Sequence, residues 1–173
     1  MRKEDRVVKS ISEFVGFLSS DTEGLKEPVW YRGLSTKEYK LLPVTARETC
    51  DTELGLIKKF KQNAKLHVNP VPSNSQEWLF VMRHHGVPTR LLDWSESPLV
   101  AAFFSAIKHD DRDGAIWALM PLELNKAYGR IWDYPDQLPS FEEDEFMEAY
   151  SPETFTKDKK SLTELHHFVL NLM

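Results

Sequence analysis

Residues 84–94 of this 173-residue chain read His-His-Gly-Val-Pro-Thr-Arg-Leu-Leu-Asp-Trp. This stretch marks the end of one predicted helix and the start of an extended or looped segment. Gly86 permits the left-handed backbone that ends many helices, and Pro88 cannot continue a helix, so a helix is expected to end here. Asn74, with Glu77 three residues later, has the pattern of a helix N-terminus. The sequence therefore predicts a helix that begins at Asn74 and ends near the histidine pair, followed by extended or looped chain.

A second helix is predicted shortly after this stretch, because Ser97-Pro98 is typical of a helix start. Residues 99–107 are apolar on nearly every side, so we expect them to form the central buried helix of the protein. Truncating a buried aromatic side chain costs on the order of 3–5 kcal/mol, and this loss is expected for Phe103→Ala. Residues 114–120 follow a polar loop and have the pattern of a central strand.

The segments on either side predict further short elements. They are a helix from Ser10, a strand over residues 29–33, an extended or turn-like stretch over 41–46, a helix that begins at Asp51 or Thr52, an acidic and charged surface segment over 135–160, and a terminal helix over 161–173. We therefore predict the α+β class, with a mixed small sheet and several packed helices in a single domain over residues 1–173.

Composition and charge narrow the class of protein. The 22 basic and 27 acidic residues give a net charge of −5, which argues against a broad nucleic-acid-binding face. A nuclease is also disfavoured, because no paired-carboxylate metal motif occurs. Cys50 is the only cysteine, so neither an internal disulfide nor a cysteine-based metal cage is expected, and no metal site is predicted. The sequence lacks a Gly-rich phosphate loop and a nucleophile elbow.

The distribution of apolar residues predicts where in the cell the protein is located. Residues 1–6 are charged and lead into no apolar run, so no secretion signal is expected. The longest apolar stretch, residues 99–107, is far too short to span a bilayer. We therefore expect a cytoplasmic protein without a membrane partner.

An apolar stripe recurs at helical spacing in residues 161–173. Its members are Leu162, Leu165, Phe168, Val169 and Leu172. A helix of this length is marginal in water unless it packs on something. We expect it to dock on its own domain, on a protein partner or on a second copy of the chain.

Two motifs are unusual enough to compare with known families. Residues 30–33 read Trp-Tyr-Arg-Gly and are followed by Leu42-Pro43, and the second motif is the stretch over residues 84–94. Together they resemble the FRG domain, which is named after an aromatic-Arg-Gly triplet and carries a His-x-Gly-x-Pro-Thr-Arg-Leu-Leu-Asp-Trp core. The resemblance covers about residues 7–120.

The chain departs from the family pattern at three places. Leu34 stands where the family has Gln after its Arg-Gly pair, and Arg83 stands where it has Gln before the histidines. The late Ile-x-x-Gln-x-Gly-x-Phe-like strand of the family has no counterpart before Met173. The resemblance therefore implies a C-terminally shortened chain.

The resemblance also implies a function. Members resemble parts of proteins in conflict between bacteria and phages, as toxins or in phage defence. An Arg on an early strand, with a later polar motif that enters a helix, is loosely similar to ADP-ribosyltransferases, which implies nucleotide binding and NAD as the cofactor. The expected function is a nucleotide- or NAD-handling enzyme or enzyme remnant. The alternative is a non-catalytic binding or sensor module that recognises a protein or small-molecule signal.

The candidate site joins the two motifs. Arg32, beside Gly33, is expected to bind a phosphate or carboxylate, or else to form a structural ion pair with Asp93. Asp93 is a candidate base or orienting acceptor, or else it caps the helix that begins near Pro98. We expect Arg32 and residues 84–93 to meet in one concave site. The candidate catalytic residues are Arg32, His84, His85 and Asp93, and the candidate ligand-binding residues are Tyr31, Gly33, Thr89 and Arg90.

The two adjacent histidines are expected to differ in role. His84 and His85 point in different directions from a helix end. One is a candidate proton-transfer group, since imidazole titrates near neutrality. The other is expected to cap the helix C-terminus, where the helix dipole favours a positive charge.

Overall fold

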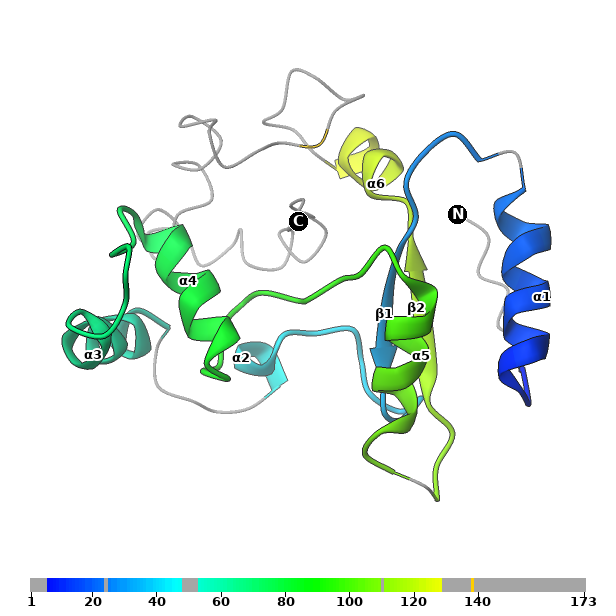
Figure 1. The fold of residues 1–173 in the computed structure, drawn as a ribbon, viewed down its shortest axis with the longest axis horizontal. Coiled ribbons are helices and arrows are strands. Elements are labelled where there is room, and N and C mark those ends of the chain that lie inside the picture. The colour runs from blue at the N-terminus through cyan, green and yellow to red at the C-terminus, as the bar shows by residue number, and fades with distance from the viewer. Residues whose placement is uncertain (1–5, 24, 48–52, 110, 129–137, 139–173) are drawn as a thin grey trace.

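The computed structural model describes residues 6–23, 25–47, 53–109, 111–128 and 138, which form several helices and a small sheet (Figure 1). The elements in chain order are α1 (Ile11–Thr22), β1 (Trp30–Leu34), α2 (Val44–Arg47), α3 (Glu53–Ala64), α4 (Ser75–His84), α5 (Pro98–Ala106), β2 (Ala115–Leu119) and α6 (Pro121–Tyr128). The fold belongs to the α+β class, as predicted. The charged segment expected over 135–160, apart from Leu138, and the helix expected over 161–173 lie outside the described residues.

Two of the helix starts follow from local capping. The Ser10 Oγ accepts a hydrogen bond from the Glu13 backbone N–H at 3.1 Å, and α1 begins at the next residue. The Asn74 Oδ1 accepts from the Glu77 backbone N–H at 2.8 Å, and α4 begins at the next residue. Each side chain satisfies a backbone donor that has no partner inside its helix, which confirms both predicted starts.

The end of α4 is fixed by a glycine. Gly86 has a φ of 74°, and its N–H donates to the Arg83 carbonyl at 3.0 Å. The Val87 N–H donates to the Met82 carbonyl at 2.9 Å. These two bonds form the Schellman motif, in which glycine adopts the left-handed conformation at no steric cost. The chain leaves α4 in a direction set by this turn.

The sheet consists of β1 and β2 within the described residues. The two strands pair antiparallel, with Arg32 opposite Trp117. On its other edge β1 meets residue 95, where the Tyr31 N–H donates to the Ser95 carbonyl at 2.7 Å and the Ser95 N–H donates to the Tyr31 carbonyl at 2.9 Å. The strand predicted over 114–120 exists as β2, but β1, and not β2, takes the central position.

Small residues let α5 lie directly on the two-stranded sheet of β1 and β2. A Cβ at Gly33 would lie 1.9 Å from the Ala101 carbonyl oxygen, and a Cβ at Gly114 would lie 2.4 Å from the Ser105 carbonyl oxygen. Ala101 and Ala102 are the buried residues of α5. The backbones approach so closely that a side chain at either glycine would separate the helix from the sheet.

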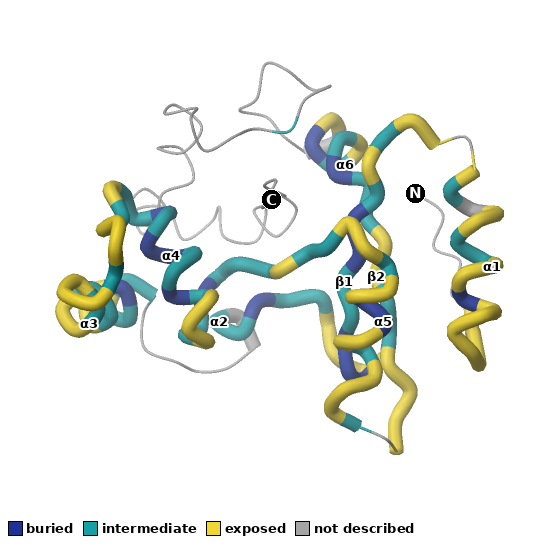
Figure 2. Tube along the Cα trace, viewed as in Figure 1, coloured by how far each residue is buried: buried dark blue, intermediate teal, exposed yellow. Residues whose placement is uncertain are grey.

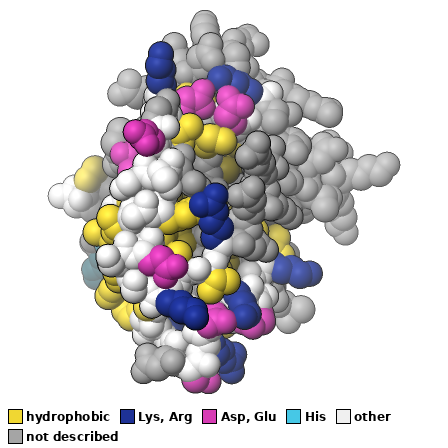
Figure 3. Space-filling model, turned by 90° about the vertical axis from the view of Figure 1, so that its right-hand side faces the viewer, with side chains coloured by type: hydrophobic (Ala, Val, Ile, Leu, Met, Phe, Trp, Pro, Cys, Tyr) yellow, Lys and Arg dark blue, Asp and Glu magenta, His cyan; other side chains and the backbone are white. Residues whose placement is uncertain are grey.

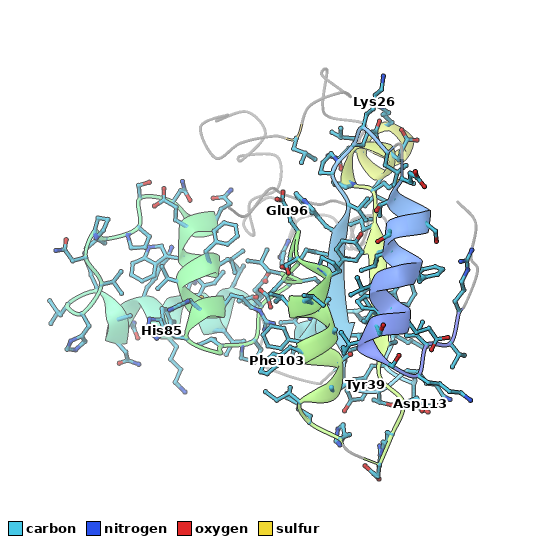
Figure 4. All side chains as sticks on the ribbon, turned by 45° about the vertical axis from the view of Figure 1, so that its right-hand side comes forward. Lys26, Tyr39, His85, Glu96, Phe103 and Asp113 are labelled. Carbon is cyan, nitrogen blue, oxygen red and sulfur yellow. The ribbon has the colours of Figure 1, made fainter. Side chains whose placement is uncertain are left out.

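The prediction that residues 99–107 form the central buried helix is wrong. Most of α5 is exposed (Figure 2), and Phe103 lies on the side of α5 away from the two strands (Figure 4). The exposed large side chains of this segment are Leu99, Val100, Phe103, Phe104 and Ile107. Because the backbone of α5 lies so close to Gly33, the face of α5 toward β1 has room only for small side chains. The large side chains therefore lie on the opposite face of α5.

This placement changes the expected effect of Phe103→Ala. Phe103 is 57% exposed, so we expect its truncation to lower the free energy of unfolding by less than about 1 kcal/mol. Urea denaturation followed by circular dichroism measures the difference from wild type. A loss of about 3 kcal/mol or more would restore the buried-helix interpretation.

A second core lies between α3 and α4, on the other side of the molecule from α1 (Figure 1). Its buried members are Ile57, Leu79 and Met82. The partly buried side chains that pack against them are Leu54, Leu56, Phe60, Val87 and Leu91. Val87 and Leu91 come from the segment after α4, so apolar packing holds the motif of residues 84–94 against this helix pair.

Two short helices differ from the sequence expectation. Residues 41–46 were expected to be extended or turn-like, but α2 begins at Val44, directly after Pro43. Proline disfavours helix at the residue before it and permits one after it, so the extended part ends at Pro43. The helix α6 was not predicted, and it begins with Pro121, a residue that suits the first helical position.

The described surface carries charges of both signs. On the face shown in Figure 3, basic and acidic side chains are intermixed and do not gather in one broad patch. No helix in the described ranges combines the length and the apolar character that crossing a bilayer requires.

Candidate functional site

Two guanidinium groups converge on Asp93, one on its carboxylate and the other on its backbone carbonyl. The Arg83 Nε lies 3.0 Å from Oδ1 and 2.8 Å from Oδ2, and the Arg83 Nη2 also donates to Oδ2. The Arg32 Nη1 donates to the backbone carbonyl of Asp93 and lies 3.8 Å from its Oδ2. We refer to Arg32, Arg83 and Asp93 as the arginine cluster.

Three separate elements supply the arginine cluster. Arg32 lies at the middle of β1, and Arg83 lies in the last turn of α4. Asp93 lies on the connection between α4 and α5, which runs from the α3–α4 side of the molecule to the sheet (Figure 1). The bridge between Tyr31 and Ser95 fixes this connection two residues beyond Asp93. The cluster therefore joins the α3–α4 pair to the sheet.

The carboxylate is the most exposed part of the arginine cluster. The Asp93 side chain is 53% exposed, whereas those of Arg32 and Arg83 are 12% and 25% exposed. The hydrogen bond to Asp93 raises the pKa of Arg83, so this guanidinium stays charged. Guanidinium groups arranged in this way can fork onto the oxygens of a phosphate or carboxylate.

The structure distinguishes between the two local roles considered for Asp93. Its carboxylate contacts arginines, and the N-cap of α5 is Ser97, which makes no side-chain capping bond. Arg32 and Asp93 meet, as expected, although 61 residues separate them. The contact with Arg83 was not predicted.

Arg90 is bound to the start of α3. Its Nε and Nη2 donate to the Glu53 Oε2, and its backbone N–H donates to the Glu53 Oε1 at 2.9 Å. The Glu53 side chain is 12% exposed, so this ion pair is largely buried. It fixes the segment after Pro88 against α3, which is a structural contribution. A ligand-binding role for Arg90 stays a prediction.

The histidine pair lies on the α3 side of α4. Figure 4 shows His85 at this end of the molecule, away from the strands. The His85 ring lies 6.0 Å from the Phe60 ring and 5.6 Å from the His84 ring, measured between centroids. His85 is the C-cap residue of α4, and both histidines are exposed. Within the described residues, no hydrogen bond or ion pair joins either imidazole to the arginine cluster. Proton transfer by them stays a prediction.

The other predicted ligand-binding residues are Thr89, Tyr31 and Gly33, and each of them packs against other parts of the protein. Thr89 is fully buried, and its hydroxyl accepts a hydrogen bond from the Leu91 backbone N–H at 3.3 Å. Tyr31 is 6% exposed, and burial raises the pKa of its phenol. Gly33 faces α5, so its missing side chain accommodates helix backbone.

Sequence reasoning missed Arg83 and Glu53 as partners of the motif. Arg83 stood out only as a departure from the family pattern, in the position directly before the histidines. A basic residue that replaces a neutral one beside a motif is a usable signal for a new ion pair. Glu53 carries no comparable signal, because an acidic residue in the first helical turn is common.

No metal centre is found in the part of the chain that the structure describes. Groups of three or more His, Cys, Asp or Glu side chains placed to hold an ion do not occur among residues 6–23, 25–47, 53–109 and 111–128.

The fold and the site together define a small α+β domain with an arginine cluster between two sequence motifs. The family model of the FRG domain matches residues 27–114, about half of the chain. The chain therefore belongs to the FRG domain family. The matched range contains β1, α4, the connection to α5 and all three residues of the arginine cluster. No curated protein and no solved structure matches the chain.

Proposed function

We propose that the arginine cluster binds an anionic ligand of the nucleotide class, with NAD as the leading candidate. The observation that carries the proposal is the convergence of Arg32 and Arg83 on Asp93, whose half-exposed carboxylate accepts hydrogen bonds from Arg83 and lies 3.8 Å from the Arg32 Nη1. The phosphate oxygens of a nucleotide have the geometry that guanidinium groups bind best.

In this proposal Asp93 is the resident counterion of the site. It keeps both guanidinium groups oriented when no ligand is bound. An arriving phosphate shares or takes over their N–H donors from the solvent side, where Asp93 is most exposed. A carboxylate that already accepts hydrogen bonds from Arg83 is better suited to orienting this guanidinium than to accepting a proton from a substrate. The geometry therefore supports binding most directly.

This assignment favours a non-catalytic binding or sensor module, and a catalytic role is the second candidate. The position of Arg32 on an early strand beside the site supports an NAD-handling enzyme, loosely similar to ADP-ribosyltransferases. The two candidates differ in one measurable product, because an enzyme of that kind releases nicotinamide from NAD and a sensor does not. In either case we propose that the domain acts in conflict between bacteria and phages. The proposal that residues 161–173 bind a partner or a second copy rests on their apolar stripe alone.

Arg32→Ala is expected to weaken NAD binding at least about tenfold, because it removes a partly desolvated charge partner of the phosphate. Calorimetric titration of the intact protein and the variant measures the change. Arg112→Ala is the matched control. This variant also removes one guanidinium charge, but the Arg112 side chain is 57% exposed. Its Nε lies 3.8 Å from the Oδ2 of the neighbouring Asp111.

Equal weakening by both variants would mean that only overall charge matters, which contradicts a specific site. If NAD, AMP and ATP all fail to bind the intact protein, the nucleotide proposal is wrong. Chromatographic measurement of free nicotinamide in the same samples then separates the enzyme from the sensor. Circular dichroism of Arg32→Ala verifies that the α+β fold is retained.

A further inference from the structure

Trp117 lies directly opposite Arg32 in the two-stranded sheet. The two residues are register partners in the antiparallel pair of β1 and β2. Side chains of directly opposite residues point to the same face of a sheet, with Cβ atoms about 4.5–5.5 Å apart. An indole ring and the first arginine of the cluster are therefore neighbours on one face.

This face is the one that α5 leaves uncovered. Gly33 follows Arg32 in β1 and therefore points to the opposite face, where its Cβ would meet α5. Arg32 and Trp117 consequently project away from α5.

The exposure of this face changes along the strands. Trp30, on the same face two residues before Arg32, is 3% exposed, and its partner is Leu119. Leu34, two residues after Arg32, is 6% exposed. Trp117 is 37% exposed, although it lies between the partners of these two buried residues. The sheet face thus opens to solvent at the tryptophan that lies beside the arginine cluster.

We propose that Trp117 stacks on the base of the ligand whose phosphate is held by the arginine cluster. This inference rests on the proposed function and narrows it, because the ligand must then carry an aromatic ring and a phosphate together. Inorganic phosphate and sugar phosphates lack the ring. Stacking of a base on an aromatic side chain strengthens binding roughly fivefold to hundredfold. Trp117 therefore determines specificity, and Arg32 supplies the charge partner.

The test compares AMP with ribose 5-phosphate, which has the same phosphate and sugar without the base. We expect the intact protein to bind AMP roughly fivefold to hundredfold more tightly than ribose 5-phosphate in calorimetric titrations. Trp117→Leu, which keeps an apolar side chain in β2, is expected to remove this difference and to leave ribose 5-phosphate binding unchanged. Trp117→Phe retains an aromatic ring and is expected to keep most of the preference. Arg32→Ala is expected to weaken both ligands.

The possible results distinguish a failure of stacking on Trp117 from a failure of anion binding by the arginine cluster. If AMP and ribose 5-phosphate bind the intact protein equally, or if Trp117→Leu preserves the preference for AMP, stacking on Trp117 is wrong while the anion site stands. If neither ligand binds the intact protein, the stacking role is wrong, and the proposed function fails as well when NAD and ATP also do not bind. Unchanged ribose 5-phosphate binding by Trp117→Leu also demonstrates that this variant is folded.

Discussion

Gly33→Ala is expected to lower the free energy of unfolding by about 3 kcal/mol or more. The added methyl group would lie 1.9 Å from the Ala101 carbonyl oxygen, 2.7 Å from the Ser105 backbone nitrogen and 2.9 Å from the Ala101 carbonyl carbon. All three atoms belong to the backbone of α5, so no side-chain rotation can relieve the overlap. The helix must move away from β1 along much of its contact with the sheet.

Gly16→Ala is the matched control for this prediction. Gly16 lies inside α1, where an added Cβ meets no atom within 4 Å. The same chemical change is therefore expected to stabilise the protein by roughly 0.5–1 kcal/mol, because alanine favours the helix. Chemical denaturation of both variants gives the comparison. A loss below about 1 kcal/mol for Gly33→Ala would show that α5 does not approach β1 so closely.

Met82→Ala is expected to cost about 2–5 kcal/mol of unfolding free energy. Met82 is completely buried between α3 and α4, where it packs with Ile57 and Leu79. Truncation removes apolar contact and leaves a cavity that the two helices fill only in part. The effect extends to the site, because Met82 precedes Arg83 and its carbonyl accepts the bond that ends α4.

Two further variants calibrate the Met82 result. Met82→Leu conserves most of the volume and is expected to cost less than about 1.5 kcal/mol. Leu66→Ala removes an apolar side chain that is 92% exposed, so a change within about 0.5 kcal/mol is expected. If Met82→Ala behaves like Leu66→Ala in urea denaturation, the α3–α4 core assignment is wrong.

The candidate site was predictable in part. Both motifs and the meeting of Arg32 with Asp93 follow from the sequence, because each motif places polar residues beside turns. The bidentate contact from Arg83 could not be predicted, since it depends on the direction in which the chain leaves α4 after Gly86. The position of Trp117 could not be predicted from the sequence either. Its position beside Arg32 is a matter of strand register between segments about eighty residues apart.

The sequence by itself determined the ends of α4, because the capping bonds of Asn74 and Gly86 span at most five residues and form wherever those residues occur. It also indicated the family through the motifs of residues 30–33 and 84–94, and the family model of the FRG domain matches residues 27–114. The tertiary structure alone decided which side of α5 is buried. Apart from Ser105, α5 is apolar, so it has no polar stripe to mark its outer face, and the position of β1 determines which side is buried. Gly33 brings the helix backbone against β1, and the small residues Ala101 and Ala102 lie on the buried side of that narrow contact.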